Sequence, residues 1–292
     1  MASKFAFVTA ASTNYLPGLY AFFNSLVMNK HKDDVVLGSF RLPEDFLESL
    51  NTLPFHTEVV NIDTTGNQSE DTAIGRFKMA YDYGQKYEAI CLVEGDLFLT
   101  GNVSTFFNIA SKGFVVVASN GMVVNFGRDY QKQYGIDLGV DQYIYPKVHT
   151  TVPIFIGMND LDWFKKFHDG RMSAHSFDDV FGLNVLGISM GKSDRILCLP
   201  PYQWTGIHHF GVKPETGWME KDGFVLSGTE EQVYMIHGKW WDEGWRSDLP
   251  LTMGRYFQRE GMTGKSTQRV QNSIDTGYRL FLRYNNGNKL KS

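Results

Sequence analysis

The sequence predicts an α/β fold in which a mixed, mainly parallel sheet is flanked by helices. Short apolar runs alternate with segments of helical periodicity from residue 5 to residue 118. Polar loops, some with Pro or Gly, separate these segments, and neither an internal repeat nor a low-complexity linker interrupts them. Strands that alternate with helices at this spacing form parallel sheets that are covered on both faces.

Composition narrows the class of protein. With 292 residues, of which 42% are hydrophobic, the chain can bury a large core, as one α/β domain or as a domain with a smaller appendage. A formal net charge of -4 gives no global positive field toward nucleic acid or an anionic membrane. Cys91 and Cys198 lie in apolar contexts, which predicts buried thiols in a reducing compartment. We find no signal peptide and no apolar run of about 18 residues, and therefore expect a cytoplasmic protein.

In the N-terminal third of the chain, the sequence predicts three strands, each followed by a helix. The first is a strand at Phe5–Ala11, a polar loop at Ser12–Tyr15 and a helix from Pro17 to about Met28, with Pro in the first turn, where its missing N–H costs nothing. The elements expected next are a strand at Val35–Phe40, a helix from Pro43 through Leu50, a strand at Phe55–Ile62, a polar loop at Gly66–Asp71 and a helix at Thr72–Lys86.

Two carboxylates follow the next predicted strand. The apolar run Ala89–Val93 ends at Glu94, and Asp96 comes one residue later, after Gly95, which allows the chain to turn. Ligands of open α/β sheets bind beyond the strand ends, and two hard oxygen ligands there suit Mg²⁺ or Mn²⁺ carrying a diphosphate. The alternative is a surface turn with a solvated Glu and Asp.

The rest of the chain continues the alternation with one interruption. Residues 119–149 show no sustained period and are expected to form a long loop region over a site. The elements predicted around it are a helix at Val103–Ala110, strands at Phe114–Ala118 and Val152–Ile156, helices at Asp160–His168 and Asp178–Met190, and strands at Ile196–Leu199 and Val233–His237.

His237 ends the last predicted strand and is a candidate third metal ligand, since imidazole binds Mn²⁺ well enough to complete a mixed site. A histidine at a strand end is more often structural. Gly238 permits close backbone approach and Lys239 offers a compact cation for a diphosphate. Trp240 and Trp241 are candidate sugar or wall contacts, with core packing as the default.

These residues together resemble the metal-dependent retaining glycosyltransferases of the GT-A fold, in particular glycosyltransferase family 8. The resemblance spans about residues 5 to 245 and keeps the family's motif order. The stretches that carry it are Phe7–Gly18 with Asn24-Ser25-Leu26, Gly75-Arg76-Phe77, Leu92–Val103 through Phe106-Phe107, Asp179 with Leu183-Asn184, and His237 with Lys239-Trp240.

The resemblance implies a UDP-sugar donor, a divalent cation (Mn²⁺ or Mg²⁺) and retention of stereochemistry by front-face attack. It implies metal ligation by Glu94, Asp96 and His237. It also implies that Asp178 or Asp179 stabilises the oxocarbenium-like state or steers the acceptor hydroxyl. The donor-binding residues it implies are Thr9, Ala10, Ala11, Asn14 and Tyr15 near the base, Arg76 at the donor site, and Gly95, Gly238 and Lys239 near the diphosphate.

The chain departs from the family pattern at four places. Glu94 replaces the first Asp of the metal motif, and its longer side chain approaches a cation from a different angle. The run from His237 to Trp240 is compressed and lacks the family's Pro. Residues Thr151-Val152-Pro153 stand where the family carries Asn-Ser-Gly. The family's Gln aligns either with Val180 or with Asp179, which leaves the residue on the reactive face open.

The character of the chain changes near residue 251, which divides it into a GT-A domain (1–250) and a basic, aromatic, helical extension (251–292). The extension is a candidate contact with an anionic membrane surface, which would bring the enzyme to a lipid-linked acceptor, or with a polyanion such as DNA. The third possibility is helices packed on the domain with their charges outward.

Three other functions compete with a transferase that acts on a glycan or glycolipid. A polyanion at the tail would make a nucleic-acid base the acceptor. Sugar nucleotidyltransferases share the sheet order but need a Gly-rich, Arg-containing loop after the first strand, which Ala11-Ser12-Thr13-Asn14 is not. A binding protein that keeps the fold without turnover is favoured by Glu94 in place of Asp. The sequence reveals neither the acceptor nor the oligomeric state.

Overall fold

The computed structural model describes residues 3–63, 68–127, 132, 142–148, 153–165, 195–199, 218–226, 232–250 and 265–291. Within these ranges the chain builds an eight-stranded sheet in the order β3-β2-β1-β4-β8-β6-β7, with β9 paired to β6. The strands are β1 (Phe5–Ser12), β2 (Asp34–Phe40), β3 (Thr57–Asn61), β4 (Ala89–Leu92), β6 (Val115–Gly127), β7 (Gln142–Val148), β8 (Ile154–Gly157) and β9 (Ile196–Leu199).

The sheet is mixed and mainly parallel, which confirms the predicted fold class. β1 pairs in parallel with both β2 and β4, β2 with β3, and β6 with β9. β8 runs antiparallel between β4 and β6, and β7 runs antiparallel to β6. Six of the eight strands therefore point the same way, and their carboxyl ends lie along one edge of the sheet.

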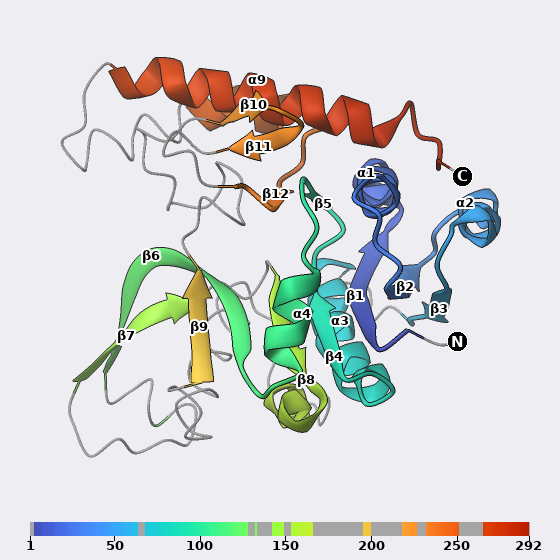
Figure 1. Ribbon diagram of the computed structural model, residues 1–292, viewed down its shortest axis with the longest axis vertical. Helices are drawn as coiled ribbons and strands as arrows, with labels where there is room; N and C mark the ends of the chain where they lie inside the picture. The colour runs from blue at the N-terminus through green and yellow to red at the C-terminus, as the bar shows by residue number, and fades with distance from the viewer. Residues whose placement is uncertain are drawn as a thin grey trace.

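Helices cover both faces of the sheet (Figure 1). β1 alternates between two core clusters: Phe7 packs in the cluster that contains residues of α1 and α4, and Val8 packs in the cluster that contains residues of α3. The helices are α1 (Leu16–Met28), α2 (Glu44–Ser49), α3 (Gln68–Gly84), α4 (Ser104–Ala110) and α9 (Lys265–Asn285), with 3₁₀ turns η1 (Thr13–Tyr15), η2 (Leu50–Thr52) and η3 (Met158–Phe164). Residues 243–250 are also helical.

Three predicted elements differ in the structure. The loop expected at Gly66–Asp71 is wrong from Gln68 onward, where α3 already begins. The long loop expected over residues 119–149 is replaced in part by β6, which continues to Gly127, and by its antiparallel partner β7; a register shift between Ser119 and Val123 hides the strand period. The helix expected at Asp160–His168 is the 3₁₀ segment η3. The helix expected at Asp178–Met190 lies outside the described residues.

Two small sheets were not predicted. β10 (Met219–Lys221) and β11 (Phe224–Leu226) form an antiparallel hairpin. β12 (Met235–His237) pairs antiparallel with β5 (Leu97–Leu99), the short apolar piece after Asp96. The last strand expected from the sequence thus exists, but it joins a two-stranded sheet rather than the main one.

The C-terminal segment is helical and basic, as predicted, and it packs on the domain. α9 lies across one end of the molecule, over the β10–β11 hairpin (Figure 1). Phe281 and Tyr284 are buried in a cluster with Trp240, so these aromatic side chains face inward. Arg279 and Arg283 form ion pairs with Glu220 of β10. Among the described residues, these two cations of the extension are therefore paired with an acid that the sequence did not single out.

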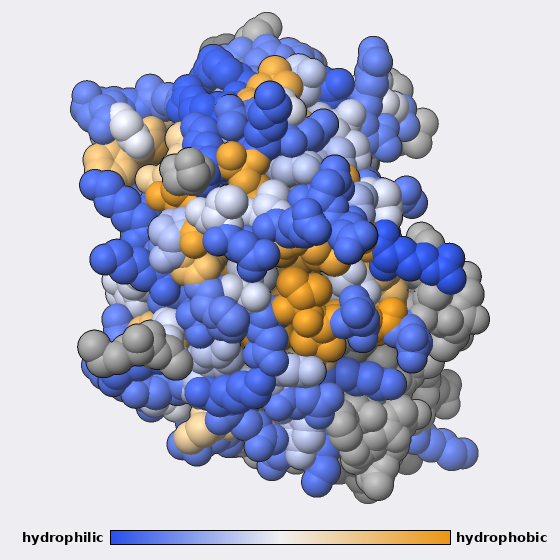
Figure 2. Space-filling model, turned by 90° about the vertical axis from the view of Figure 1, so that its right-hand side faces the viewer, coloured by the Kyte–Doolittle hydropathy of each residue, from blue (hydrophilic) through white to orange (hydrophobic). Residues whose placement is uncertain are grey.

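Hydrophilic residues cover most of the surface visible in Figure 2, with apolar residues in small groups among them. Exposed apolar side chains of this kind are normal on proteins in water. Among the described helices, none combines the length and the apolar character needed to cross a bilayer.

Candidate metal centre

The acidic turn lies at the carboxyl end of β4, beside the end of β1. The two strands run in parallel with Val8 opposite Leu92, and the Val93 N–H donates to the Val8 carbonyl at 2.9 Å. The chain then turns at Gly95, which is buried: a Cβ there would lie 3.1 Å from the Ala11 Cβ. Glu94 and Asp96 therefore leave the sheet at the edge where ligands of open α/β folds bind.

His237 reaches this turn through the small β5–β12 sheet. In that sheet His237 lies opposite Leu97, the residue after Asp96. The Gly238 N–H donates to the Asp96 carbonyl at 2.9 Å, which extends the pairing by one residue. Gly238 has a φ of 139°, and a Cβ there would lie 2.3 Å from the Trp245 ring, so this position requires glycine.

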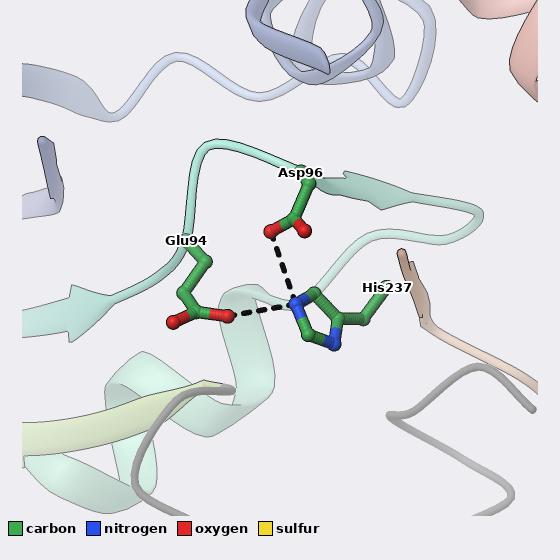
Figure 3. A group of neighbouring side chains, drawn as sticks. All are labelled: Glu94, Asp96 and His237. Carbon is green, nitrogen blue, oxygen red and sulfur yellow. Dashed lines mark hydrogen bonds and ion pairs between the residues drawn. The ribbon is translucent and has the colours of Figure 1, made fainter. Parts of the chain in front are cut away.

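The three side chains converge on one point (Figure 3). His237 Nε2 lies 2.7 Å from Oε2 of Glu94 and 3.0 Å from Oδ1 of Asp96. One ligand atom from each residue lies within 4.8 Å of the other two. The Asp96 and His237 side chains are 8% and 5% exposed, and that of Glu94 is 19% exposed, so the cluster is largely shielded from water.

Arg76 belongs to the same site. It lies on α3, and its Nη1 forms an ion pair with Oε1 of Glu94 at 2.7 Å, with the Arg76 side chain only 5% exposed. Glu94 is therefore held between Arg76 and His237, one oxygen facing each. The sequence placed Arg76 at the donor site but gave no sign of this ion pair.

These contacts shift the pKa values of the cluster in opposite directions. Burial by itself raises the pKa of Glu94, but the Arg76 charge and the His237 hydrogen bond outweigh it and lower the pKa to about 2. Burial by itself lowers the pKa of His237, but the carboxylates of Asp96 and Glu94 outweigh it and raise the pKa to about 10. Without a metal, these contacts thus favour the protonated imidazole of His237 and the ionised carboxyl group of Glu94 at neutral pH.

Two of the three distances between the donor atoms are compatible with ligands of one divalent cation. Two ligands at right angles around Mg²⁺, each 2.0–2.1 Å from it, lie roughly 2.9 Å apart. The distances from Nε2 of His237 to the two carboxylate oxygens, 2.7 and 3.0 Å, match that spacing. Two carboxylates and one imidazole form a mixed donor set that suits Mn²⁺ and, less well, Mg²⁺. On binding, the metal would take the place of the proton on Nε2.

Tyr15 and Lys239 form the wall of the site next to the acidic turn. The Lys239 Nζ lies 5.3 Å from the Tyr15 ring centroid, a cation–π contact, and the Trp241 ring meets the Tyr15 ring edge-on at 5.9 Å. Burial, followed by the charges of Asp96 and Glu94, raises the pKa of Tyr15. The structure thus brings together Tyr15, Lys239 and the acidic pair.

The other residues expected to bind the donor differ in their accessibility. Thr9, Ala10 and Ala11 are 0%, 2% and 0% exposed, so their side chains belong to the core near the end of β1. Asn14 is exposed. Asp178 and Asp179, expected on the reactive face, lie outside the described residues.

Trp240 and Trp241 differ in their surroundings. Trp240 is 0% exposed and packs against Gly277 of α9, where a Cβ would lie 2.4 Å from the indole ring; core packing, the default, holds for it. Trp241 contacts Tyr15 and Phe281 and so links the wall of the site to α9. In the sequence, only the position of Trp241, two residues after Lys239, indicated that this side chain lies at the wall of the site.

No protein-family model matches the chain, and no curated protein matches it in sequence. Solved structures do match its fold. WbbM, a bifunctional glycosyltransferase, matches with a TM-score of 0.54 and 12% identity over 94% of this chain and 52% of the WbbM chain. An active-site mutant of LgtC matches with a TM-score of 0.51 and 10% identity over 91% of this chain and 99% of that one.

A third match is the galactosyltransferase LgtC in complex with donor and acceptor sugar analogues, with a TM-score of 0.47 and 10% identity over 89% of this chain and 96% of that one. The chain spans about half the length of WbbM and nearly all of LgtC. The matches with WbbM and the LgtC mutant confirm the fold implied by the sequence resemblance.

Proposed function

We propose that this chain, which has the fold of the GT-A glycosyltransferases, is itself a metal-dependent glycosyltransferase. Its donor would be a UDP-hexose and its acceptor a hydroxyl group of a glycan or glycolipid. The meeting of Glu94, Asp96 and His237 at the carboxyl edge of the sheet carries the proposal. A surface turn with a solvated Glu and Asp does not require an imidazole beside the carboxylates. A structural histidine does not require ligand atoms of two carboxylates within 4.8 Å of its ring nitrogen.

The proposed ligands of the cation are Oε2 of Glu94, Oδ1 of Asp96 and Nε2 of His237. Imidazole favours Mn²⁺ over Mg²⁺, so Mn²⁺ is the ion we propose first. When bound, the ion supplies positive charge where the departing UDP develops negative charge. The protein fixes the three ligands on a strand end and a paired strand, which limits their rearrangement during the reaction.

Lys239 and Tyr15 are proposed to contact the donor. Lys239 adds a positive charge to that of the metal ion, beside the acidic turn, where the diphosphate would lie. The contact with the Tyr15 ring restricts the position of the Lys239 ammonium group. The resemblance further implies retention of stereochemistry, with Asp178 or Asp179 on the reactive face. The glucose or galactose identity of the donor is open in this proposal.

Two observations bear on the competing functions. Glu94 in place of Asp favours a protein that binds the donor without turnover. Arg279 and Arg283 are paired with Glu220, so a contact of the extension with an anionic membrane or a nucleic acid would depend on its remaining cations. This weakens the case for either contact of the extension, and we keep a glycan or glycolipid hydroxyl as the proposed acceptor.

The test is release of UDP from UDP-glucose and from UDP-galactose, measured with the purified chain in Mn²⁺, in EDTA, and after Mn²⁺ is restored. We expect release that EDTA abolishes and Mn²⁺ restores. The matched variants are Asp96→Asn, expected to lose release, and Glu220→Gln, which removes an equal charge far from the turn and is expected to keep it.

Calorimetry with UDP separates the remaining outcomes. UDP binding without release from either donor would overturn turnover and leave the binding protein. Absence of UDP binding in Mn²⁺ would remove both the transferase and the binding protein. Where release occurs, mass spectrometry of the products formed with a panel of acceptors identifies the acceptor class.

A further inference from the structure

The carboxylate of Glu94 is divided between two partners. Its Oε1 faces Nη1 of Arg76 at 2.7 Å, and its Oε2 faces Nε2 of His237 at 2.7 Å. Both contacts are short, and the Arg76 and His237 side chains are each 5% exposed, so water competes little for either oxygen. Glu94 therefore presents one oxygen to the proposed metal position and keeps the other engaged.

Arg76 is well placed to keep this arrangement. It lies on α3 directly before the buried residues Phe77, Met79 and Ala80, which anchor this part of the helix in the core. Its guanidinium also lies 5.9 Å from the Phe77 ring centroid. Because Glu has one methylene more than Asp, the side chain at position 94 spans from the turn to Arg76 while its second oxygen still reaches His237.

The number of oxygens that a carboxylate offers affects which cation it suits. Ca²⁺ takes six to eight oxygen ligands and often binds a carboxylate through both oxygens, whereas Mg²⁺ requires a near-octahedral set at short distances, and Mn²⁺ favours the same geometry. A carboxylate held to one oxygen removes a ligand that Ca²⁺ would use and leaves the octahedral set unchanged.

We propose that Arg76 is a positioning residue that sets the cation preference of the site. By holding Oε1 it makes Glu94 a one-oxygen ligand, and the site then favours Mn²⁺ and Mg²⁺ over Ca²⁺. This rests on the proposed function, because it takes the Glu94, Asp96 and His237 cluster as the place where a divalent cation binds.

The test compares the affinities of the purified chain for Mn²⁺, by paramagnetic resonance titration, and for Ca²⁺, by competition against bound Mn²⁺. The ratio of the two affinities is the readout, since loss of the Arg76 charge changes the attraction for every divalent cation alike and cancels in the ratio. In Arg76→Gln we expect the ratio to shift toward Ca²⁺ by at least about fivefold.

Two variants control for charge and for the contact itself. Arg279→Gln breaks an exposed Arg–Glu ion pair with the same change of charge and is expected to leave the ratio as in the wild type. Arg76→Lys keeps a cation that donates to Oε1 through a single group, so its ratio is expected to lie between those of the wild type and Arg76→Gln.

A ratio in folded Arg76→Gln within twofold of the wild type would overturn the inference. Should that variant not fold, a crystal structure of the wild type grown with Mn²⁺ decides: ligation by one Glu94 oxygen with Oε1 on Arg76 supports the inference, and bidentate Glu94 overturns it. If the wild type binds no divalent cation, the metal-dependent function fails as well. Cation binding with an Arg76-dependent ratio but no UDP release would leave this inference standing and overturn the transferase.

Discussion

Nε2 of His237 lies 3.0 Å from Oδ1 of Asp96, although 141 residues separate the two along the chain. The antiparallel pairing of β5 and β12 fixes this contact, because it sets His237 opposite Leu97 and brings the Gly238 N–H to the Asp96 carbonyl. Backbone hydrogen bonds thus position the imidazole before any ion is bound. The predictions below test what this pairing does for the site.

Replacing Asp96 by Asn should weaken Mn²⁺ binding strongly with little change of shape. The amide keeps the size of the carboxylate but removes its charge and one proposed ligand. We expect the rate of UDP release to fall on the order of 10²-fold or more, measured by steady-state kinetics at saturating Mn²⁺. Asp275→Asn on the exposed face of α9 is the matched control and should leave the rate unchanged. An Asp96→Asn enzyme with the wild-type rate would rule out the proposed ligand.

In the metal-free protein, Glu94 and His237 should contribute most to stability between about pH 4.5 and 6.5. The pKa of His237 rises from 6.5 to about 10 on folding, so its contribution is complete below pH 6.5 and is lost as the pH rises toward 10. The pKa of Glu94 falls from 4.5 to about 2, so its contribution is complete above pH 4.5 and is lost as the pH falls toward 2. Thermal unfolding in EDTA from about pH 2 to about pH 10 measures the loss of stability on both sides of this range, and His237→Gln should reduce the loss above pH 6.5.

Substitution of Gly18 by Ala should displace the backbone of the acidic turn at Gly95. A Cβ at Gly18 would lie 2.3 Å from the Gly95 carbonyl oxygen and 2.8 Å from the Trp241 ring. We expect a loss of about 1–3 kcal/mol of unfolding free energy from overpacking and a weaker affinity for Mn²⁺. The control is Gly244→Ala, in the helix at residues 243–250, where the nearest atom is a side-chain oxygen 3.3 Å away. Equal stability of the two variants in urea would contradict the expectation.

The Tyr15 ring, rather than its hydroxyl group, should matter for donor binding. Lys239 contacts the ring face, and Trp241 meets the ring edge-on. Tyr15→Phe keeps both contacts and is expected to bind UDP as the wild type does. Tyr15→Leu removes the cation–π contact and should lower the affinity several-fold, in line with roughly 0.5–1 kcal/mol for such a contact. Calorimetry with UDP in Mn²⁺ distinguishes the two, and equal losses in both variants would point to the hydroxyl instead.

Asn24 should be essential for holding the C-terminal residues on α1. Its side-chain amide donates to the carbonyls of Tyr284 and Lys289 at 2.7 and 2.8 Å, and its carbonyl accepts from the Lys291 N–H at 2.7 Å. Asn24→Ala leaves these three backbone groups without their partner and should cost about 2–4 kcal/mol. Denaturant unfolding measures the loss. Asn108→Ala, on the exposed surface of α4, is expected to change stability by less than about 0.5 kcal/mol.

Local patterns in the sequence predicted most of the main sheet. β1, β2, β4 and β8 follow from short apolar runs, because burial on both faces leaves a continuous apolar run that is visible in the sequence. The pattern failed where this signal weakens. Ser119, Asn120 and Gly121 interrupt the apolar run of β6, although the strand continues through them and pairs with β7 across a register shift. β5 and β12 have three residues each, too few to show any period.

The sequence also identified Glu94, Asp96 and His237 as candidates, and it did so from chemistry and strand ends alone. It did not indicate that Arg76 pairs with Glu94, that Lys239 lies on the Tyr15 ring, or that Glu220 forms ion pairs with two arginines of the extension. Each of these contacts joins different elements of the fold, and no local pattern records such a distance.

The sequence by itself determined the α/β class, the strand that delivers the acidic pair, and the helical, basic character of the C-terminal segment, because periodicity, apolar length and charge are properties of neighbouring residues. Only the tertiary structure decided that His237 meets Asp96, that one oxygen of Glu94 is committed to Arg76, and that the aromatic side chains Phe281 and Tyr284 face inward. Strand pairing and helix packing bring together residues that are distant in sequence, and their free energy depends on contacts that exist only once the chain has folded.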